Sequence, residues 1–160
     1  MSSWIDAPTV VFLDTNIFVY AFMASDERKR SRAVQLIEGA LGAGTGRISY
    51  QVVQEFANVA RKKFAQRMTT ADCTAFIEAA MQPMNRVASS TELLLNAFEL
   101  QDELRYSFYN SLVLGAALQA GASKLYTEDL QHWQLVRGTL RIVNPFVDAV
   151  HESVAPLTPP

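Results

Sequence analysis

The stretch Thr9-Val10-Val11-Phe12-Leu13-Asp14-Thr15-Asn16 decides the fold of this chain of 160 residues. Its first five residues are β-branched, aliphatic or aromatic and carry no charge, which predicts a strand buried on both faces. Such strands occur in parallel sheets that helices cover on both sides. Asp14 follows the strand directly, at the edge of the sheet where ligand sites form. A helix cap is the simpler role for Asp14, and the two roles are compatible.

Helical patterns and short strands alternate along the rest of the chain. Strands are expected near residue 48 and at residues 86–88, 124–127 and 141–143, and helices at residues 17–23, 26–41, 51–65, 69–83, 91–104 and 108–120. Ser25, Thr91 and Ser107 are the expected helix caps, and Gly121 is expected to end the last helix. The alternation predicts an α/β protein, a three-layer α/β/α fold with a central short-stranded parallel sheet. We expect a single domain at residues 1–150 and a C-terminal tail at residues 151–160.

The composition limits the class of protein. Hydrophobic residues make up 49% and charged residues 19%, which excludes a disordered chain. The net charge of −2 lacks the basic excess of a dedicated nucleic-acid binder, although a local basic patch suffices for binding. The single cysteine, Cys73, allows no internal disulfide, so a reducing, cytoplasmic location is expected. Residues 106–124 are too polar for a membrane span, and the N-terminus shows no secretory pattern.

Four polar residues on different segments are candidates for one site. Besides Asp14, Glu55 borders the apolar face of a helix, Asn110 lies in the first turn of the last helix, and Asp129 follows a strand. Each has an ordinary alternative: a solvated helix border for Glu55, a helix cap for Asn110 and a turn for Asp129. Together they lie where they can converge at the edge of the sheet that holds Asp14.

A site with several carboxylates favours a divalent cation. Closely packed carboxylates repel each other, and one of them takes up a proton unless a cation is present. Oxygen ligands without His or Cys indicate Mg²⁺ or Mn²⁺ rather than Zn²⁺. Carboxylate-held Mg²⁺ activates water and stabilises charge on a phosphoryl group, so the residues favour hydrolysis of phosphodiester bonds.

Four segments occur in an order that is typical of one family. They are Val11-Phe12-Leu13-Asp14-Thr15-Asn16, Val52-Val53-Gln54-Glu55-Phe56, Ser107-Phe108-Tyr109-Asn110-Ser111-Leu112 and Leu125-Tyr126-Thr127-Glu128-Asp129-Leu130. The ordered set resembles the PIN domain family, in particular the VapC-type ribonuclease toxins of VapBC toxin–antitoxin pairs. The resemblance implies a compact α/β/α fold and a Mg²⁺- or Mn²⁺-dependent endoribonuclease that hydrolyses RNA. It also implies a cognate antitoxin that neutralises the toxin, and often a homodimer.

The resemblance also assigns the site residues. Asp14, Glu55 and Asp129 match the family's catalytic, metal-binding carboxylates. Thr127 matches a hydroxyl residue two positions before the last acid, and Asn16 and Thr127 are expected to support the ligands rather than bind the metal. Asn110 stands where the family has Asp, so it retains an oxygen for the metal but has no charge and cannot act as a base.

Two explanations of Asn110 remain open from the sequence. Asn110 is either the natural residue of a weak or degenerate nuclease, or an engineered Asp→Asn change that silences a toxic enzyme. Both explanations bear on the activity of this chain rather than on its resemblance to the family.

Two runs of basic residues have alternative interpretations. A solvated helix end is the default interpretation of Arg61, Lys62, Lys63 and Arg67, and contact with the RNA backbone is the functional one. A second run comprises Arg28, Lys29, Arg30 and Arg32. A solvated helix face is its favoured interpretation, and RNA binding is the alternative. Trp4 and Trp133 are candidates for surfaces that bind a partner protein.

Two other functions compete with the nuclease hypothesis. The first is a PIN-like module that has lost catalysis and binds RNA or a partner protein, which Asn110 supports. The second is a phosphatase of the haloacid-dehalogenase type, which requires a second acid two residues after Asp14. Position 16 is Asn and no convincing lysine motif follows, so the phosphatase hypothesis is disfavoured.

Overall fold

The computed structural model describes residues 9–147, which build a six-stranded sheet with helices on both faces. Its strands are β1 (Val11–Leu13), β2 (Gly46–Ser49), β3 (Asn85–Val87), β4 (Lys124–Tyr126), β5 (Leu135–Val136) and β6 (Leu140–Val143). Its helices are α1 (Thr15–Tyr20), α2 (Glu27–Ala43), α3 (Tyr50–Lys62), α4 (Thr70–Phe76), α5 (Thr91–Leu104) and α6 (Phe108–Gln119). The expected domain boundary at residue 150, the tail and Trp4 lie outside the described residues.

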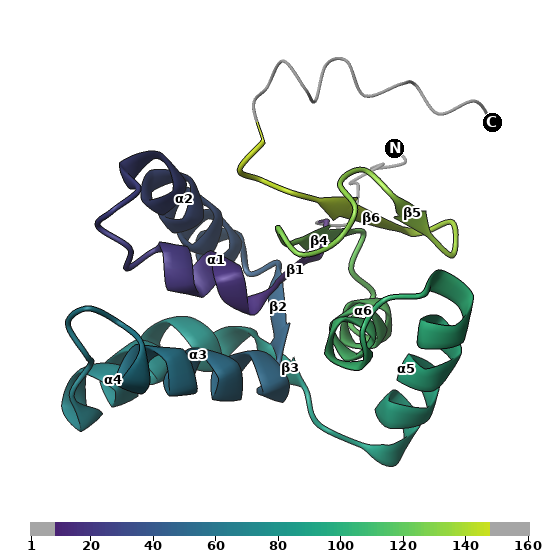
Figure 1. The fold of residues 1–160 in the computed structure, drawn as a ribbon, viewed down its shortest axis with the longest axis horizontal. Helices are drawn as coiled ribbons and strands as arrows, with labels where there is room; N and C mark the ends of the chain where they lie inside the picture. Colours follow the sequence, from purple (N-terminus) through teal and green to yellow (C-terminus); the bar gives the residue numbers. More distant parts are fainter. Residues whose placement is uncertain (1–8, 148–160) are drawn as a thin grey trace, which may run out of the picture.

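The sheet has the order β3-β2-β1-β4-β6-β5, with β1 paired in parallel to both β2 and β4. Phe12 and Leu13 of β1 are fully buried, as the uncharged opening stretch predicts. Figure 1 shows α1 to α4 on one side of the sheet and α5 and α6 on the other. The three-layer α/β/α fold is therefore confirmed. The sheet is mostly parallel, because β5 pairs antiparallel with β6 at one edge.

The connections between strands and helices bring the N-termini of α1, α3 and α6 to one edge of the sheet. Helices α1 and α3 begin directly after β1 and β2, and α6 leads back to the start of β4. Because these strands are parallel, the first turns of all three helices lie at the edge where the strands end. Asp14 caps α1 and Asn110 lies in the first turn of α6, while Glu55 lies in the second turn of α3. The topology therefore gathers them on one side of the molecule.

Two of the three expected helix caps are shifted by one residue. Asp26 caps α2 in place of Ser25, and Ser90 caps α5 in place of Thr91. In both cases adjacent residues can cap, and the local sequence does not determine which one keeps the extended backbone of a cap. Ser107 caps α6 as expected, through its Oγ and the backbone N–H of Asn110 at 3.2 Å.

The helix expected at residues 69–83 is interrupted. Helix α4 ends at Phe76 and the chain continues as a π turn at Ile77–Met81 and a 3₁₀ turn at Gln82–Met84. Pro83 has no backbone N–H and its ring clashes with the preceding helical turn, which explains the change of helix type.

Helix α6 lies between the sheet and α5. It packs on β2, β4 and α5, and its residues from Val113 to Ala117 are all buried. This burial explains why the segment is apolar around its whole circumference. Within residues 9–147, no helix is both long enough and apolar enough to cross a membrane.

The close packing of Gly46 at the start of β2 gives a first prediction. A Cβ on Gly46 would clash with Met84 Sδ and lie 2.9 Å from the Cβ of Ala40. We expect Gly46→Ala to lower the free energy of unfolding by about 1–3 kcal/mol, measured by urea denaturation. The control is Gly42→Ala in α2, where a Cβ meets nothing within 4 Å and should stabilise the protein slightly. Equal stabilities of the two variants would contradict this packing.

Candidate active site

Asp14 is the centre of the site at the ends of β1 and β4. Only 4% of its surface is exposed, and it caps α1 by accepting a hydrogen bond from the backbone N–H of Thr15 at 2.7 Å. Its second carboxylate oxygen accepts a hydrogen bond from the hydroxyl of Thr127 at 2.7 Å. Asp14 is thus a helix cap that lies at the end of β1. A carboxylate so deeply buried is costly unless it has partners of this kind.

Thr127 connects Asp14 to the fourth acidic segment. Its hydroxyl oxygen accepts hydrogen bonds from the backbone N–H of Asp129 at 3.1 Å and from the side-chain amide of Asn16 at 3.2 Å. The hydroxyl proton is then directed to Asp14. Thr127 is fully buried, and hydrogen bonds on both sides determine its orientation.

Asn16 lies between Thr127 and the carboxylate of Asp129. Its Nδ2 donates to Asp129 Oδ2 at 3.1 Å, and because a carboxylate only accepts, the amide orientation is defined. The other atom of the amide group, Oδ1, is buried and has no hydrogen-bond partner among the described residues. An unpaired buried acceptor is rare, and it marks Asn16 as more than a support for Asp129.

Glu55 approaches the site through Thr15. Its Oε2 accepts a hydrogen bond from the Thr15 hydroxyl at 2.7 Å, and its Oε1 accepts one from Gln51 at 2.7 Å. Thr15 therefore touches Asp14 with its backbone and Glu55 with its side chain. Glu55 is half-buried at the border of α3, as its position in the helix predicts.

Burial raises the pKa of the Asp14 carboxyl from 3.8 to about 6. The hydrogen bonds from Thr127 and Thr15 oppose this shift, and the nearby charges of Asp129 and Glu55 add to it. The folded protein therefore holds a proton on Asp14 between about pH 4 and pH 6, where the unfolded chain has lost it. Stability falls as the pH rises through this window, because an ionised Asp14 is unfavourable in the folded state.

Asn110 lies at the same edge of the sheet but outside this hydrogen-bond network. It is half-buried in the first turn of α6, and within residues 9–147 its side chain makes no hydrogen bond. The edge of the sheet that holds Asp14, Glu55 and Asp129 is called the acidic edge below, and the topology brings position 110 to it. Direct hydrogen bonds join Asp14, Asn16, Thr127 and Asp129, and Glu55 is linked to Asp14 through Thr15.

The residues of the site fit a hard divalent cation by their chemistry. All the side-chain acceptors are oxygens, and the mutual repulsion of Asp14, Glu55 and Asp129 is the kind that a cation relieves. The unpaired Asn16 Oδ1 is a further oxygen available to a metal. The described residues contain no preformed cluster of three acidic, His or Cys side chains arranged around a metal position. The fit to a divalent cation therefore depends on the oxygen donors of these side chains and on the unpaired Oδ1 of Asn16.

The basic residues of α3 and the segment after it are all exposed. The guanidinium of Arg61 donates to the Thr70 hydroxyl at 2.9 Å, and the rest of the set comprises Lys62, Lys63 and Arg67. A role of these residues in RNA binding stays a prediction.

The interpretation of the run Arg28 to Arg32 as only a solvated helix face is wrong for two of its members. Lys29 forms an ion pair with Glu128 at 3.2 Å, and Arg32 donates from Nε to the carbonyl of Pro145 at 3.4 Å. Both partners are about 100 residues away in the sequence, so no local pattern could indicate them.

Sequence reasoning did not identify Thr15, Gln51 or Glu128 as parts of this region. Thr15 directly follows Asp14, and Gln51 precedes Glu55 by one helical turn, so spacing contained a signal for both. Glu128 had a weaker signal, since it separates Thr127 from Asp129.

Trp133 is half-buried, and the guanidinium of Arg141 lies 5.4 Å from its ring. This burial limits the surface that Trp133 offers to a partner protein.

The Thr127–Asp14 hydrogen bond gives a second prediction. We expect Thr127→Val to destabilise the protein by about 1–3 kcal/mol, since it leaves Asp14 and the N–H of Asp129 without their partner. The loss should be larger at pH 8 than at pH 4, because the hydroxyl stabilises the ionised form of Asp14. Thr127→Ser retains the hydroxyl and is the control. Urea denaturation at both pH values measures the effect, and a loss independent of pH would contradict it.

Comparison with known proteins agrees with the fold. A family model of the PIN domain matches residues 11–137. No protein of curated function matches the sequence significantly. Among solved structures, a toxin–antitoxin complex from Klebsiella pneumoniae has a TM-score of 0.60 at 20% identity and covers 86% of this chain and 98% of its own.

Two further structures show the same similarity of fold. VapBC2 from Rickettsia felis, bound to a DNA fragment from its promoter, has a TM-score of 0.60 at 18% identity and covers 85% of this chain and 100% of its own. VapC20 from Mycobacterium tuberculosis, a sarcin–ricin loop cleaving toxin, has a TM-score of 0.56 at 20% identity and covers 74% and 89%. The family model spans most of the chain and includes the segments of Asp14, Glu55, Asn110 and Asp129, and the chain therefore belongs to the PIN domain family.

Proposed function

We propose that this protein is a Mg²⁺- or Mn²⁺-dependent endoribonuclease that hydrolyses phosphodiester bonds of RNA. The observation that supports it most is the buried Asp14, linked through Thr127 to Asn16 and Asp129 and close to Glu55. This arrangement has oxygen donors and excess negative charge, and membership of the PIN family agrees with it.

The residues of the site have separate tasks in this proposal. Asp14, Asp129 and the Asn16 Oδ1 hold the cation, with Glu55 and Asn110 beside them. A bound Mg²⁺ or Mn²⁺ lowers the pKa of a water molecule and neutralises charge on the phosphate. Thr127 and Thr15 keep the Asp14 carboxylate in one orientation through the two hydrogen bonds that it accepts. Glu55, fixed by Thr15 and Gln51, supplies negative charge near Asp14.

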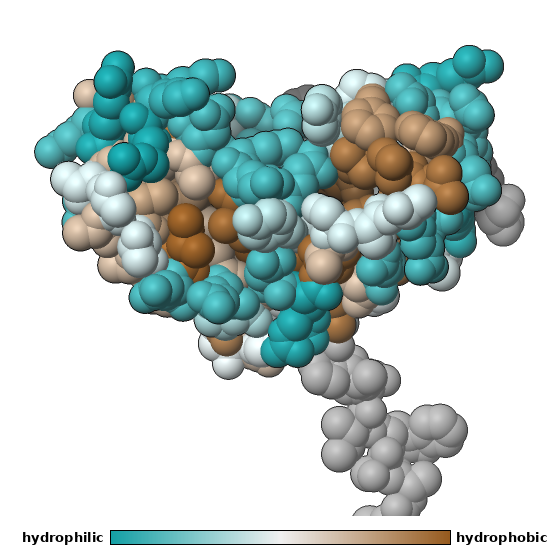
Figure 2. Space-filling view, turned by 90° about the horizontal axis from the view of Figure 1, so that it is seen from below, coloured by the Kyte–Doolittle hydropathy of each residue, from teal (hydrophilic) through white to brown (hydrophobic). Residues whose placement is uncertain are grey.

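The proposed biological role is that of a toxin neutralised by a cognate antitoxin in the cytoplasm. The similarity to structures of toxin–antitoxin complexes supports this role. A protein-binding surface is available as well. Leu95 and Phe98 of α5 are 53% and 45% exposed, and Figure 2 shows an apolar patch on the side of the molecule where α5 lies. Exposed apolar patches of this kind favour contact with an antitoxin or a second copy of the chain.

A second function is favoured by one residue. Asn110 lacks the charge of the family's Asp, and its side chain has no hydrogen bond among the described residues. A PIN domain without catalysis, which binds RNA or a protein partner, therefore remains the alternative proposal.

Cleavage of labelled RNA distinguishes the two. The Asn110→Asp variant is incubated with several structured and unstructured RNAs in Mn²⁺ or in EDTA. The nuclease proposal predicts internal cuts with Mn²⁺ only, and suppression of cleavage by the antitoxin encoded beside the toxin gene. Intact RNA in every reaction, with an unchanged circular dichroism spectrum, would support the binding module instead.

A further inference from the structure

The acid Asp129 lies in a loop after β4 that contains neither helix nor strand. This loop comprises residues 127–134 and is called the Asp129 loop below. Within residues 9–147, no backbone N–H group of residues 128–132 donates to a backbone carbonyl. The N–H groups of Asp129 and Gln131 donate instead to the hydroxyls of Thr127 and Tyr106, both at 3.1 Å. Side chains, rather than a ladder of backbone hydrogen bonds, therefore determine where the loop places its acid.

Both ends of the Asp129 loop are tied to β6. At one end the N–H of Thr127 donates to the Val143 carbonyl at 3.0 Å. At the other end Trp133 has a φ of 73°, a left-handed conformation that is unfavourable for a bulky residue. Its N–H donates to the Ile142 carbonyl and its own carbonyl accepts from Arg141, both at 2.7 Å. The strand thus fixes the two ends, and the residues between them need other partners.

Tyr106 holds the part of the loop that follows the acid. Its hydroxyl accepts a hydrogen bond from the N–H of Gln131 at 3.1 Å and donates one to Oε1 of Gln134 at 2.5 Å. Its ring is half-buried and packs against the hydrophobic core. Because Tyr106 lies two residues before α6, it links the loop to the helical turn that carries Asn110.

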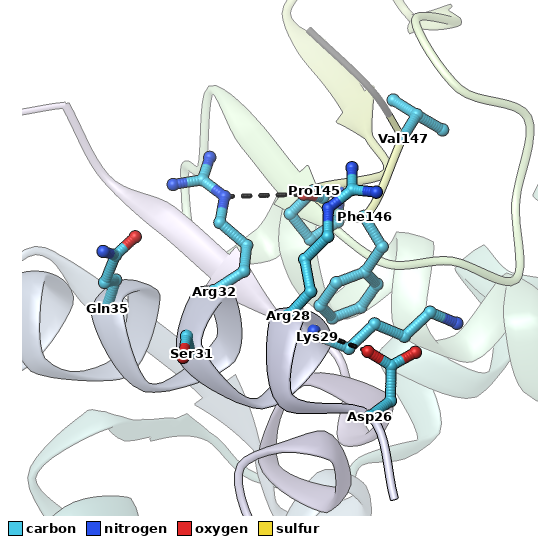
Figure 3. A pocket seen from close by; sticks show the side chains of 9 residues that line it. All are labelled: Asp26, Arg28, Lys29, Ser31, Arg32, Gln35, Pro145, Phe146 and Val147. Carbon is cyan, nitrogen blue, oxygen red and sulfur yellow. Dashed lines mark hydrogen bonds between the residues drawn. The ribbon is translucent and has the colours of Figure 1, made fainter.

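Tyr20 holds the part of the loop that precedes the acid. Its hydroxyl donates to Glu128 Oε1 at 2.5 Å, and the ammonium of Lys29 contacts both the Tyr20 hydroxyl and Glu128 Oε2 at 3.2 Å. Figure 3 shows the Lys29 side chain beside the Phe146 ring and directed away from the arginines that line the same pocket. The Tyr20 ring packs edge-on against Phe146 at 4.9 Å, so the direction of its hydroxyl is fixed.

The two tyrosines reach the loop from opposite layers of the fold. Tyr20 ends α1 on one side of the sheet, and Tyr106 lies between α5 and α6 on the other (Figure 1). Their hydroxyls contact Glu128 and Gln131, which lie one residue before and two residues after the acid. Holding the chain at these two points removes conformational freedom from the residue between them. The carboxylate of that residue accepts from Asn16 Nδ2 at 3.1 Å, at the acidic edge.

We propose that Tyr20 and Tyr106 are positioning residues that hold the Asp129 carboxylate where it binds the cation. The cation belongs to the proposed function, on which this part of the inference rests. Neither hydroxyl contacts the carboxylate itself, and each acts through the loop.

The first measurement is made without metal. Amide hydrogen exchange is followed by NMR in EDTA for the wild type, Tyr20→Phe and Tyr106→Phe, because Phe keeps the packed ring and removes only the hydroxyl. Exchange of the Asp129 amide should become about fivefold faster in each variant, since the loop loses a hydrogen bond that holds it closed. The amides of β1 should change less, because they report opening of the whole sheet.

Two control variants separate an effect on the loop from other effects. Tyr50→Phe removes an exposed hydroxyl at the start of α3 that makes no hydrogen bond within residues 9–147. Gly46→Ala is expected to destabilise the fold from the opposite edge of the sheet. If, relative to the amides of β1, the Asp129 amide exchanges no faster in the tyrosine variants than in Gly46→Ala, the tyrosines only stabilise the fold and the inference is wrong.

The second measurement is the Mn²⁺ affinity of the same proteins by calorimetry. Tyr20→Phe and Tyr106→Phe should each bind Mn²⁺ about three- to tenfold more weakly, whereas Tyr50→Phe should bind it as tightly as the wild type. The loss should vanish when Asp129→Asn is also present, because the tyrosines act through this carboxylate. An equal loss with and without Asp129→Asn, or an unchanged affinity despite faster exchange, would contradict the inference.

The outcomes also separate this inference from the nuclease proposal. If the wild type binds no Mn²⁺ while exchange at Asp129 depends on both tyrosines, the positioning of Asp129 is supported and the nuclease proposal is contradicted. If Asn110→Asp cleaves RNA only with Mn²⁺ while exchange and affinity are unaltered in the tyrosine variants, the nuclease is supported and the positioning is contradicted.

Discussion

Replacing Asp14 by Asn is expected to abolish RNA cleavage while making the folded protein more stable at alkaline pH. In the Asn110→Asp background, cleavage with Mn²⁺ should fall by at least about 100-fold, because the change removes the charge of the central ligand. The free energy of unfolding of the Asp14→Asn variant should instead increase at alkaline pH. The ionised Asp14 is unfavourable in the fold, since burial raises its pKa to about 6, and Asn carries no charge to bury.

The pH dependence makes this prediction specific. An amide at position 14 also loses an acceptor for the Thr127 hydroxyl, and that constant cost cancels when two pH values are compared. Relative to wild type, the stability of Asp14→Asn should rise by about 2–3 kcal/mol between pH 4 and pH 8 without metal. Urea denaturation in EDTA measures it. A stability difference that is the same at both pH values would show that burial does not disfavour the ionised form of Asp14.

Metal ions should reverse the effect in the wild type. A cation bound to ionised Asp14 stabilises the folded state, so Mn²⁺ should raise the Tm of the chain and leave the Tm of Asp14→Asn unchanged. Gln54→Glu, on the exposed side of α3 next to Glu55, is a control for added surface charge. An equal rise of Tm in all three proteins would indicate metal binding away from Asp14.

The second large effect is expected at position 110. Asn110→Asp adds a carboxylate at the edge where α6 begins, so we expect Mn²⁺ to bind about 10- to 100-fold more tightly, measured by calorimetry. RNA cleavage should rise with it, because Asp supplies the charge that Asn lacks. Without metal the same variant should be slightly less stable at pH 8, since another carboxylate joins Asp14, Glu55 and Asp129.

A neighbouring position provides the control for charge alone. Tyr109 is 65% exposed in the same turn of α6, so Tyr109→Asp adds the same charge without placing it at the same point of the helix. If Tyr109→Asp tightens metal binding as much as Asn110→Asp, then position 110 has no particular role in the site.

The fold was accessible from the sequence because its main features are local or periodic. The uncharged strand before Asp14 and the apolar helix at residues 108–120 indicate layers that are buried on both faces, and the structure has both. Strand β5 escaped prediction because two residues, Leu135–Val136, have no period to detect. The caps of α2 and α5 shifted by one residue because each helix begins with two adjacent residues that can cap.

The candidate site was accessible only as a list of residues. Strand ends indicated Asp14 and Asp129, and the border of an apolar helix face indicated Glu55. The hydrogen bonds that link these residues depend on contacts between distant segments. Thr127 and Asp14 are 113 residues apart, and Lys29 and Glu128 are 99 residues apart.

The acidic edge around Asp14 is, in this proposal, a divalent-metal site that cleaves RNA. The most direct test is cleavage of labelled RNA by Asn110→Asp as Mn²⁺ is titrated, beside the same variant with Asp14→Asn. We expect internal cuts that appear with increasing Mn²⁺, are absent in EDTA and are lost with Asp14→Asn. Cleavage that persists in EDTA, or that survives Asp14→Asn unchanged, would contradict the claim.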